Sequence, residues 1–402
     1  MESLHGIPGG KKEVWNTVSR IYLDGTLTTR TDPQVLEEML PYFTEKYAVP
    51  SSQFSHSHGK AIEEEIEKRR EFIKGYIDGK EGKLIFTSGG TEANNLAIKG
   101  FARENWDKGM HIISSSIEHQ SVRHTLYTLE KEGFDVTYLP VSPEGYVDPD
   151  DVKKNIREDT ILVTLQHSNP EVGVIQPIEE IGKIVKEKGI AFHVDAAYST
   201  GWIPFSVENW KADMVTLTAH KVHGPKGTGA LWIRDGIKIK PLIDGTFHEY
   251  GLRGGIPNIP GIIGFAKALE LMDDEERERV KYLRDYLWKR LKEEIEDIKL
   301  NGPEERHPAN LNVTIRYVEG EAVVIQLDLL GVSVTTGSAC FSRKLEASYV
   351  LRAMGVPYED AHGSLRFGIS RFTTEKEIDE AVSRLKEVVE RLRKISPLGR
   401  KE

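Results

Sequence analysis

Short apolar runs alternate with longer amphipathic segments over most of the chain. The apolar runs predict buried strands, and they are residues 84–86, 111–115, 136–140, 161–165, 191–194, 214–217 and 230–233. Between them, apolar residues recur at helical spacing, as Ile62, Ile66, Ile73 and Ile77 do along one face of a predicted helix. Strands that alternate with helices in this way predict a mostly parallel sheet covered by helices.

The alternation changes after about residue 263. The predicted elements beyond that point are a long helix with an apolar face over 280–295, strands near 311–315 and 364–369, and a final helix with apolar positions between 378 and 392. Thr374 and Glu377 form a capping-box pattern just ahead of the final helix. The last third of the chain therefore mixes helices and strands without regular alternation.

This change of pattern predicts two domains. We expect residues 21–265 to form a large α/β domain, and residues 1–20 and 266–402 to form a smaller α+β domain. The chain has 402 residues, which is more than a single hydrophobic core usually supports. Its hydrophobic residues make up 39% of the total, which is enough for sizeable cores.

Charge and cysteine content narrow the class of function. The net charge of −9 argues against nucleic acid or a membrane surface as the main partner. No apolar run approaches the length that crosses a bilayer, and the first 20 residues lack the apolar core of a signal peptide. The single cysteine cannot form an internal disulfide, so we expect a reducing, cytoplasmic location. We assign no metal site.

The single cysteine, Cys340, lies in segment 336–342, where Gly337, Ser338 and Ala339 precede it. Small residues of this kind are typical of a flexible loop, on which a thiol would be placed for chemistry at sulfur. A free cysteine is more often buried as a small hydrophobic residue, and reactivity requires exposure and a lowered pKa. The cysteine alone leaves both interpretations open.

Three other features carry candidate chemistry. Residues 87–92 join a strand through two glycines to a helix, which can present free N–H groups to a phosphate or can simply be a tight turn. Asp195 ends an apolar strand, where α/β sheets place ligand-binding groups, although it could also cap a helix. Lys221 follows His220 at another strand end, and a protected lysine readily becomes a nucleophile for carbonyl groups. Together they suit pyridoxal phosphate, with lysine for its aldehyde, aspartate for its ring nitrogen and the glycine loop for its phosphate.

At this point the chain resembles the cysteine desulfurases, which are fold-type-I, class-V pyridoxal-phosphate enzymes. The motifs that carry the resemblance are 87–95 (Thr-Ser-Gly-Gly-Thr-Glu-Ala-Asn-Asn), Glu118-His119, 193–197 (His-Val-Asp-Ala-Ala), Ala219-His220-Lys221, 337–340 (Gly-Ser-Ala-Cys), and the stretches 345–355 and 360–367. They occur in the family's order and spacing, and the likeness extends from about residue 21 to 395. The resemblance implies a fold-type-I architecture with a large domain of mostly parallel sheet and a smaller C-terminal domain that carries the cysteine loop.

The resemblance also implies a role for each matching residue. Lys221 would hold the cofactor covalently and then move the substrate's α-proton, Asp195 would pair with the ring nitrogen, and His119 would stack over the ring and assist proton transfer. Arg366 would clamp the substrate carboxylate, a task that suits a bidentate guanidinium. Cys340 would attack the substrate sulfur, keep it as a persulfide and release alanine. The residues implied to hold the phosphate are Gly90, Thr91, Thr218 and His220.

Four departures from the family pattern fall at the cofactor or substrate site. Pro170 replaces an asparagine that packs near the cofactor's phenolic oxygen, with Asn169 one residue earlier. Tyr198 replaces a glutamine, and its phenol could still donate to that oxygen. Ile256 replaces a phosphate-binding threonine borrowed from the partner subunit, and residues 24–29 replace the family's Asn-Ala-Ala-Thr-Thr. Because isoleucine cannot donate a hydrogen bond, we expect weaker cofactor retention than is typical.

The leading hypothesis is an L-cysteine desulfurase that supplies sulfur for iron–sulfur cluster assembly or tRNA thiolation. One alternative is a related class-V lyase or aminotransferase acting on selenocysteine or cysteine sulfinate, and another is a weakly active or non-catalytic homologue that kept the fold. The resemblance implies a homodimer, which also fits the general preference for two-fold symmetry. Because persulfide sulfur moves by thiol exchange, we expect a sulfur-acceptor or scaffold protein as a partner.

Overall fold

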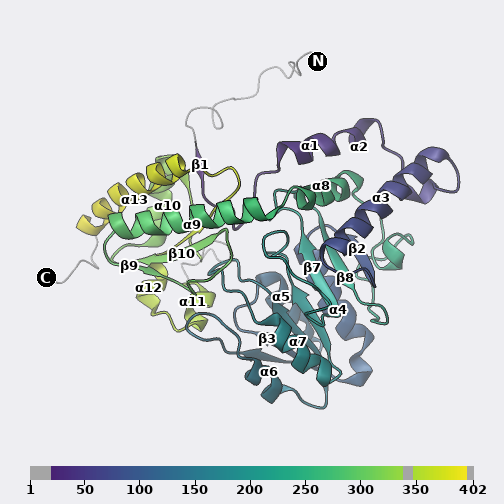
Figure 1. Ribbon diagram of the computed structural model, residues 1–402. Coiled ribbons are helices and arrows are strands. Elements are labelled where there is room, and N and C mark those ends of the chain that lie inside the picture. Colours follow the sequence, from purple (N-terminus) through teal and green to yellow (C-terminus); the bar gives the residue numbers. More distant parts are fainter. Residues whose placement is uncertain (1–19, 338–346, 396–402) are drawn as a thin grey trace.

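A seven-stranded sheet forms the centre of the larger part of the molecule in a computed structural model that describes residues 20–337 and 347–395 (Figure 1). Its strands, in spatial order, are β2 (Lys83–Thr87), β8 (Gly229–Ile233), β7 (Met214–Thr218), β6 (Ala191–Asp195), β5 (Thr160–Gln166), β3 (His111–Ser115) and β4 (Asp135–Leu139). Strand β8 runs antiparallel to both its neighbours, and every other pair is parallel. The predicted mostly parallel sheet is therefore confirmed.

Helices cover both faces of this sheet, because its strands are apolar on both sides. The helices that pack on one face are α3 (Ser57–Tyr76), α6 (Pro149–Asn155), α7 (Ile178–Glu187) and α8 (Ile259–Glu270). The helices that pack on the other are α4 (Gly90–Glu104) and α5 (Gln120–Lys131). Trp232 and Phe192 are among the largest side chains that these layers bury completely.

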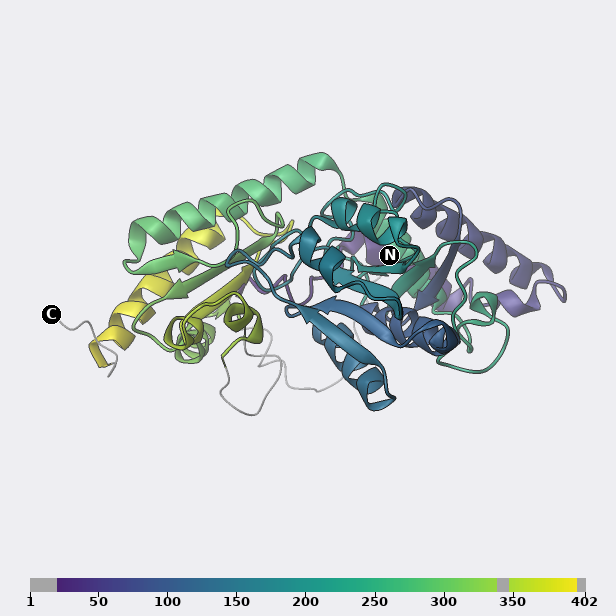
Figure 2. The same ribbon diagram turned by 90° about the horizontal axis from the view of Figure 1, so that it is seen from below.

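A smaller sheet lies beside the large one and is built mainly from the last third of the chain (Figure 2). Its antiparallel strands, in order, are β12 (Ser364–Gly368), β10 (Asn310–Ile315) and β9 (Ile298–Leu300). The helices of this part are α9 (Asp274–Glu294), α10 (Gly320–Leu329), α11 (Tyr349–Ala353), α12 (Tyr358–His362) and α13 (Glu375–Ile395). A two-stranded parallel pair joins β1 (Ile21–Tyr22) to β11 (Val332–Ser333), so the start of the described chain packs with its last third.

The remaining elements are short. They are α1 (Pro33–Met39), α2 (Pro41–Thr44), and the 3₁₀ turns η1 (Pro50–Ser52), η2 (Trp106–Lys108) and η3 (Glu249–Gly251). Among residues 20–337 and 347–395, no helix combines the length and apolar content that a membrane span needs.

Each strand predicted from apolar runs is present, within a residue or two of its expected bounds. The predicted capping box is also confirmed, because the Glu377 amide donates to Thr374 Oγ1 at 3.2 Å and the Thr374 amide donates to Glu377 Oε2 at 2.9 Å. The very short strands β1, β9 and β11 were not predicted, because two or three residues carry too little periodicity to detect. The division into domains at residues 20 and 265 stays a prediction.

Candidate active site

A cavity of about 480 Å³ opens at the carboxyl ends of the central strands of the large sheet. Gln166, Asp195 and Thr218 line it, and they are the last residues of β5, β6 and β7. This edge of a parallel sheet is where α/β folds gather ligand-binding groups. All of the residues predicted to bind the cofactor line this one cavity, and they are Gly90, Thr91, His119, Asp195, Tyr198, Thr218, His220 and Lys221.

The glycine loop forms the start of helix α4. Gly89 precedes the helix with a φ of 143°, a conformation that favours glycine over residues with a Cβ atom. The Glu92 carboxylate accepts the Ser88 N–H at 2.8 Å and pairs with Arg253 at 3.1 Å, which holds the loop in place. The first turn of α4 therefore borders the cavity with N–H groups suited to an anion.

Asp195 is buried at the end of β6 with both carboxylate oxygens occupied. Asn94 Nδ2 donates to Oδ2 at 2.7 Å, and the Ala197 N–H donates to Oδ1 at 2.9 Å. Burial raises the pKa of Asp195, while these two donors and nearby Lys221 act in the opposite direction. A protonated ring nitrogen beside this carboxylate would also lower the pKa of Asp195 and so favour its ionised form. The site therefore fits a cation next to Asp195.

Lys221 lies at the other wall, beyond the end of β7. Its Nζ donates to the carbonyl oxygens of Thr26 and Leu27, at 2.8 Å for Leu27, and lies 5.6 Å from the centre of the Tyr198 ring. The neighbouring His220 contacts Thr28 Oγ1 at 3.2 Å through Nδ1. Burial, together with the positive charge of Lys221, lowers the pKa of His220 to about 3, so this ring is neutral.

His119 precedes helix α5 and caps it. Its Nδ1 accepts the Ser121 N–H at 3.2 Å and lies 2.8 Å from Ser121 Oγ. An accepting Nδ1 assigns the ring proton to Nε2. The ring is open to the cavity. Partial removal from water by the surrounding protein lowers the pKa of His119, and the positive charges of Lys221 and Arg366 lower it further, so the ring is neutral near pH 7.

Arg366 lies on β12 of the small sheet, outside the lining of the cavity. It is close enough for its positive charge to lower the pKa of His119, which does line the cavity. Its side chain is buried, and Nε and Nη2 have no partner among the described residues. Burial raises the pKa of nearby Asp24 to about 6, although Arg366 and Lys221 lower it. An unpaired buried guanidinium fits an incoming carboxylate.

Cys340 lies outside the described residues, so its predicted role is not placed. The chain that leads to it can be followed to Gly337. Thr335 pairs with Arg366 across the sheet, with the Arg366 N–H donating to the Thr335 carbonyl at 2.7 Å. The described chain therefore passes the predicted carboxylate clamp, Arg366, just before it ends at Gly337.

The polar groups around the cavity fit a polar cofactor. Buried polar atoms normally have hydrogen-bond partners. Within the described residues, however, Asn94 Oδ1, Ser168 Oγ and the Tyr198 hydroxyl are buried on residues that line the cavity and have none. With Asp195 for a ring nitrogen, Lys221 for an aldehyde and the first turn of α4 for a phosphate, this donor set matches pyridoxal phosphate.

Several lining residues were not predicted from the sequence. Asn94 lies within the glycine-loop motif, and its buried contact with Asp195 required the fold to become visible. Ser121 accepts a hydrogen bond from Asn94 at 2.8 Å and so connects Asp195 to His119. Ser168 follows β5, and in its segment the sequence pattern singles out only Asn169 and Pro170.

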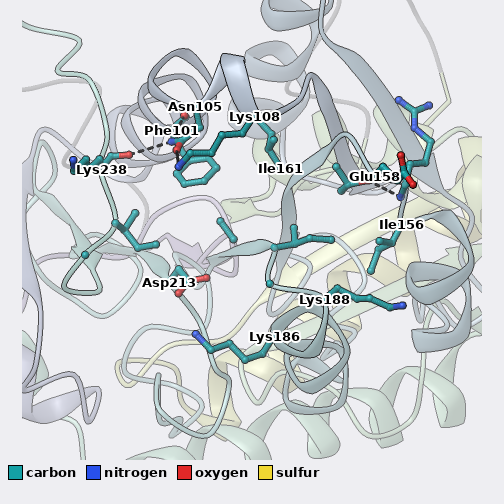
Figure 3. A pocket seen from close by; sticks show the side chains of 17 residues that line it. Phe101, Asn105, Lys108, Ile156, Glu158, Ile161, Lys186, Lys188, Asp213 and Lys238 are labelled. Atoms are coloured by element: carbon teal, nitrogen blue, oxygen red, sulfur yellow. Dashed lines mark hydrogen bonds between the residues drawn. The ribbon is translucent and has the colours of Figure 1, made fainter.

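A second cavity of about 810 Å³ lies at the amino ends of β5 and β6, the opposite edge of the sheet (Figure 3). Its lining includes Lys108, Lys186, Lys188 and Lys238, with Asp213 among them. It contains none of the residues that the sequence predicts for the cofactor. The smaller cavity at the carboxyl edge is therefore the candidate active site.

Comparison with known proteins agrees with this geometry. Residues 21–381 match the family described as aminotransferase class-V. A cysteine desulfurase, IscS, from Dictyoglomus turgidum is 48% identical over 94% of this chain and 96% of its own length. Among solved structures, a NifS-like protein superposes with a TM-score of 0.86 at 36% identity, over 92% of this chain and 99% of its own. A protein described as SspA in complex with cysteine superposes with a TM-score of 0.79 at 33% identity, over 88% of this chain and all of its own.

The chain belongs to the class-V aminotransferase family and, within it, to the cysteine desulfurases. The cofactor of this family is pyridoxal phosphate.

Proposed function

We propose that this protein is a pyridoxal-phosphate-dependent L-cysteine desulfurase that converts L-cysteine to L-alanine and keeps the sulfur as a persulfide on Cys340. The observation that carries the proposal is the convergence of Lys221, Asp195 and the first turn of α4 on one cavity. Relatives at 43–48% identity over 94% of the chain carry the name cysteine desulfurase, and one structural relative is described in complex with cysteine.

The chain's own residues divide the work of binding the cofactor. Lys221 would hold it covalently through Nζ, and Asp195 would pair with its ring nitrogen. Gly90, Thr91, Thr218 and His220 would hold its phosphate, since all four border the cavity. When bound, pyridoxal phosphate supplies an electron sink that weakens the bonds at the amino acid's α- and β-carbons.

Proton transfer falls to Lys221 and His119. Lys221 Nζ would carry the substrate's α-proton, because a lysine released from the cofactor is a base that lines the same cavity. His119 is neutral, with its proton on Nε2, and can therefore donate at that atom. Arg366 would bind the substrate carboxylate through its unpaired guanidinium nitrogens.

Sulfur transfer would use Cys340. Its thiolate forms a bond to the substrate sulfur while the bond between that sulfur and the β-carbon breaks. The electron pair and a proton end on the β-carbon, so L-cysteine and a thiol become L-alanine and a persulfide. The persulfide then passes its outer sulfur to a cysteine of an acceptor or scaffold protein by thiol exchange. Delivery to iron–sulfur clusters or tRNA thiolation, and a cytoplasmic location, remain predictions.

We also propose that the working unit is a homodimer. Exposed apolar side chains gather on two segments, and they are Leu36, Leu40, Phe43, Tyr47 and Phe54 on the first, and Ile243, Phe247, Tyr250 and Ile256 on the second. Both segments contact helix α3 at neighbouring residues, because Arg69 bonds Glu38 and Arg70 bonds Glu249. Exposed apolar groups in this number support a protein interface, and a two-fold dimer is the commonest kind.

Alanine and sulfide production from L-cysteine, with added pyridoxal phosphate and a thiol reductant, tests the enzymatic proposal. We expect both products in equal amounts, and, when the reductant is left out, one added sulfur atom on Cys340 by mass spectrometry. Lys221→Ala should lose the near-visible absorption and the activity, while Lys238→Ala, in the second cavity, should keep both. A wild-type protein that stays colourless with added cofactor would contradict the proposal.

The same assay separates the related chemistries. Cys340→Ala should lose persulfide formation from L-cysteine. If the wild-type protein cleaved selenocysteine but released no sulfide from L-cysteine, a related lyase activity would replace the desulfurase proposal. Retention of the cofactor through dialysis tests the expected weak binding, which nanomolar affinity would contradict.

A further inference from the structure

The wall of the cavity around residue 170 lacks the amide that the family resemblance places there. Pro170 lines the cavity but carries neither a polar side chain nor an N–H group. Neighbouring Asn169 does not take over, because its Oδ1 accepts two backbone N–H groups at 2.8 and 3.0 Å and its Nδ2 donates to the Ile117 carbonyl at 3.0 Å. The side-chain oxygen and nitrogen of Asn169 are therefore both engaged by backbone groups, and Asn169 is not part of the cavity lining.

Ser168 is the next polar group on this wall. It is only 2% exposed, it lines the cavity, and its Oγ has no partner among residues 20–337 and 347–395. A bridge to Ile175 fixes its backbone. A buried hydroxyl without a partner costs free energy unless a ligand completes it, so Ser168 Oγ points to a polar atom of a bound molecule.

Tyr198 is the second hydroxyl, and its ring is rigidly held. The ring stacks on His307 with 4.0 Å between centres, and His307 Nε2 donates to the Tyr198 carbonyl at 3.0 Å. The side chain is 5% exposed. Burial raises the pKa of Tyr198, and a contact with the Asn310 side chain opposes this rise, but neither the hydroxyl nor Asn310 Oδ1 has a hydrogen-bond partner of ordinary geometry in the described chain.

Both hydroxyls belong to neighbouring strand ends. Gln166 of β5 pairs with Asp195 of β6 in parallel register, and Ser168 and Tyr198 follow these two residues past the same edge of the sheet. Tyr198 also lies beside Lys221, whose Nζ is 5.6 Å from its ring centre. In pyridoxal phosphate, the aldehyde carbon that bonds a lysine is attached to the ring carbon next to the one that bears the phenolic oxygen, so this oxygen would lie within reach of groups beside Lys221.

We propose that the hydroxyls of Ser168 and Tyr198 together hydrogen-bond the cofactor's phenolic oxygen, replacing the two amides that Pro170 and Tyr198 displace. The proposal rests on the proposed function, since it requires the cofactor to be joined to Lys221. It assigns Ser168 to the cofactor site and explains how the chain dispenses with an asparagine at residue 170.

The near-visible absorption of the loaded protein, followed against pH, tests this pairing. Donors to the phenolic oxygen stabilise its negative charge and weaken its hold on the proton of the adjacent lysine linkage. Removing a donor should therefore raise the pH at which the absorption changes. We expect Ser168→Ala and Tyr198→Phe each to raise this midpoint by about one unit, the size of a hydrogen bond to a charged group, and the double variant to raise it further.

Matched controls separate the hydroxyl from simple damage. Ser168→Thr keeps a hydroxyl and should keep the midpoint near that of the wild type. Ser199→Ala removes another buried, unpartnered hydroxyl that does not line the cavity, and should leave the midpoint unchanged. Apart from Tyr198 itself, the titratable groups that face Lys221 are the same in every variant, and they are Asp24, His119, Asp195, His220 and His307.

The possible results are distinct. A wild-type protein without near-visible absorption would defeat the proposed function itself. A coloured wild type whose midpoint is unmoved in both Ser168→Ala and Tyr198→Phe would defeat only this inference. An equal shift in Ser168→Thr and Ser168→Ala would also overturn it, because the effect would then not depend on the hydroxyl.

Discussion

Asn94 illustrates how one buried side chain sets the charge of another. Its Nδ2 donates to Asp195 at 2.7 Å and to Ser121 at 2.8 Å, and the side chain is almost wholly buried. Burial alone would drive Asp195 toward its neutral form, and a hydrogen bond to the carboxylate opposes this. The ionised form is the one that can pair with a protonated ring nitrogen.

Asn94→Ala should therefore weaken cofactor binding. The pKa of Asp195 would rise further, and a neutral carboxyl pairs poorly with a cation. We expect about 10- to 100-fold weaker affinity, the size of a lost hydrogen bond to a charged group, with the loss larger at lower pH. Spectroscopic titration with pyridoxal phosphate at pH 6 and pH 8 measures it.

Asn155→Ala, on α6, is the control variant and should bind as the wild type does. Unchanged affinity in Asn94→Ala at both pH values would show that Asp195 does not depend on this donor.

At the residue scale, motif order predicted the lining of the site but not its hydrogen bonds. Lys221, Asp195, His119 and the glycine loop all line the predicted site. The sequence does not single out Ser168, because a lone serine has no periodicity and its importance depends on the absence of a hydrogen-bond partner among the described residues.

The strands of the large sheet are held together by buried polar contacts as well as by apolar packing. His193 on β6 contacts Thr164 on β5 at 2.8 Å and Thr216 on β7 at 3.0 Å. Burial lowers the pKa of His193 to about 3, so the folded protein keeps this ring neutral. An unfolded chain would protonate it near the ordinary value of about 6.5.

This difference gives the sheet a measurable dependence on pH. The stability that neutral His193 contributes is complete above about pH 6.5 and is lost as the pH falls toward 3, because the unfolded state then binds a proton that the folded state does not. His193→Gln removes this dependence. The destabilisation that it causes should therefore shrink by about 2 kcal/mol between pH 8 and pH 5.

Urea unfolding of both proteins at the two pH values measures the change. The same substitution at exposed His124, on α5, is the matched control. A destabilisation by His193→Gln that is constant with pH would mean that the buried ring takes up a proton while the protein stays folded.

Element prediction succeeded for the segments that the apolar pattern singled out. Helices α3, α9 and α13 and the strands of the large sheet were expected from periodicity. Strand β1 could not be, because its two residues are ordered only by pairing with β11, which is far along the chain. Long-range pairing of this kind leaves no local signal.

The whole molecule presents apolar side chains that one chain does not cover. Phe54 is 93% exposed and Phe247 is 96% exposed, and both lie on the segments that flank helix α3. Ile256, in the place of a threonine that the family borrows across its dimer, is 63% exposed and lies outside the lining of the cavity. Ile256 therefore points away from the cavity of its own chain, as a residue that contacts the site of a partner subunit must do.

Phe43→Glu should disrupt the proposed dimer, because a buried unpaired carboxylate at an interface costs several kcal/mol. Sedimentation velocity of the wild type should give twice the mass of the chain, and the variant should shift toward a single chain. Leu329→Glu changes a similarly exposed apolar residue on α10 and should leave the mass unchanged. A monomeric wild type would contradict the dimer.

The sequence by itself determined the class of fold, the order of the large elements and the cofactor chemistry, because these depend on local periodicity and on motifs that keep their spacing. Only the tertiary structure decided which side chains meet. The cavity forms where β5, β6 and β7 end together. Arg366 belongs to a separate sheet, and its positive charge lowers the pKa of His119 in the cavity. Whether Ser168 or Asn169 faces a ligand depends on which polar atoms the folded chain has already paired, and that is a property of contacts between distant residues rather than of residue order.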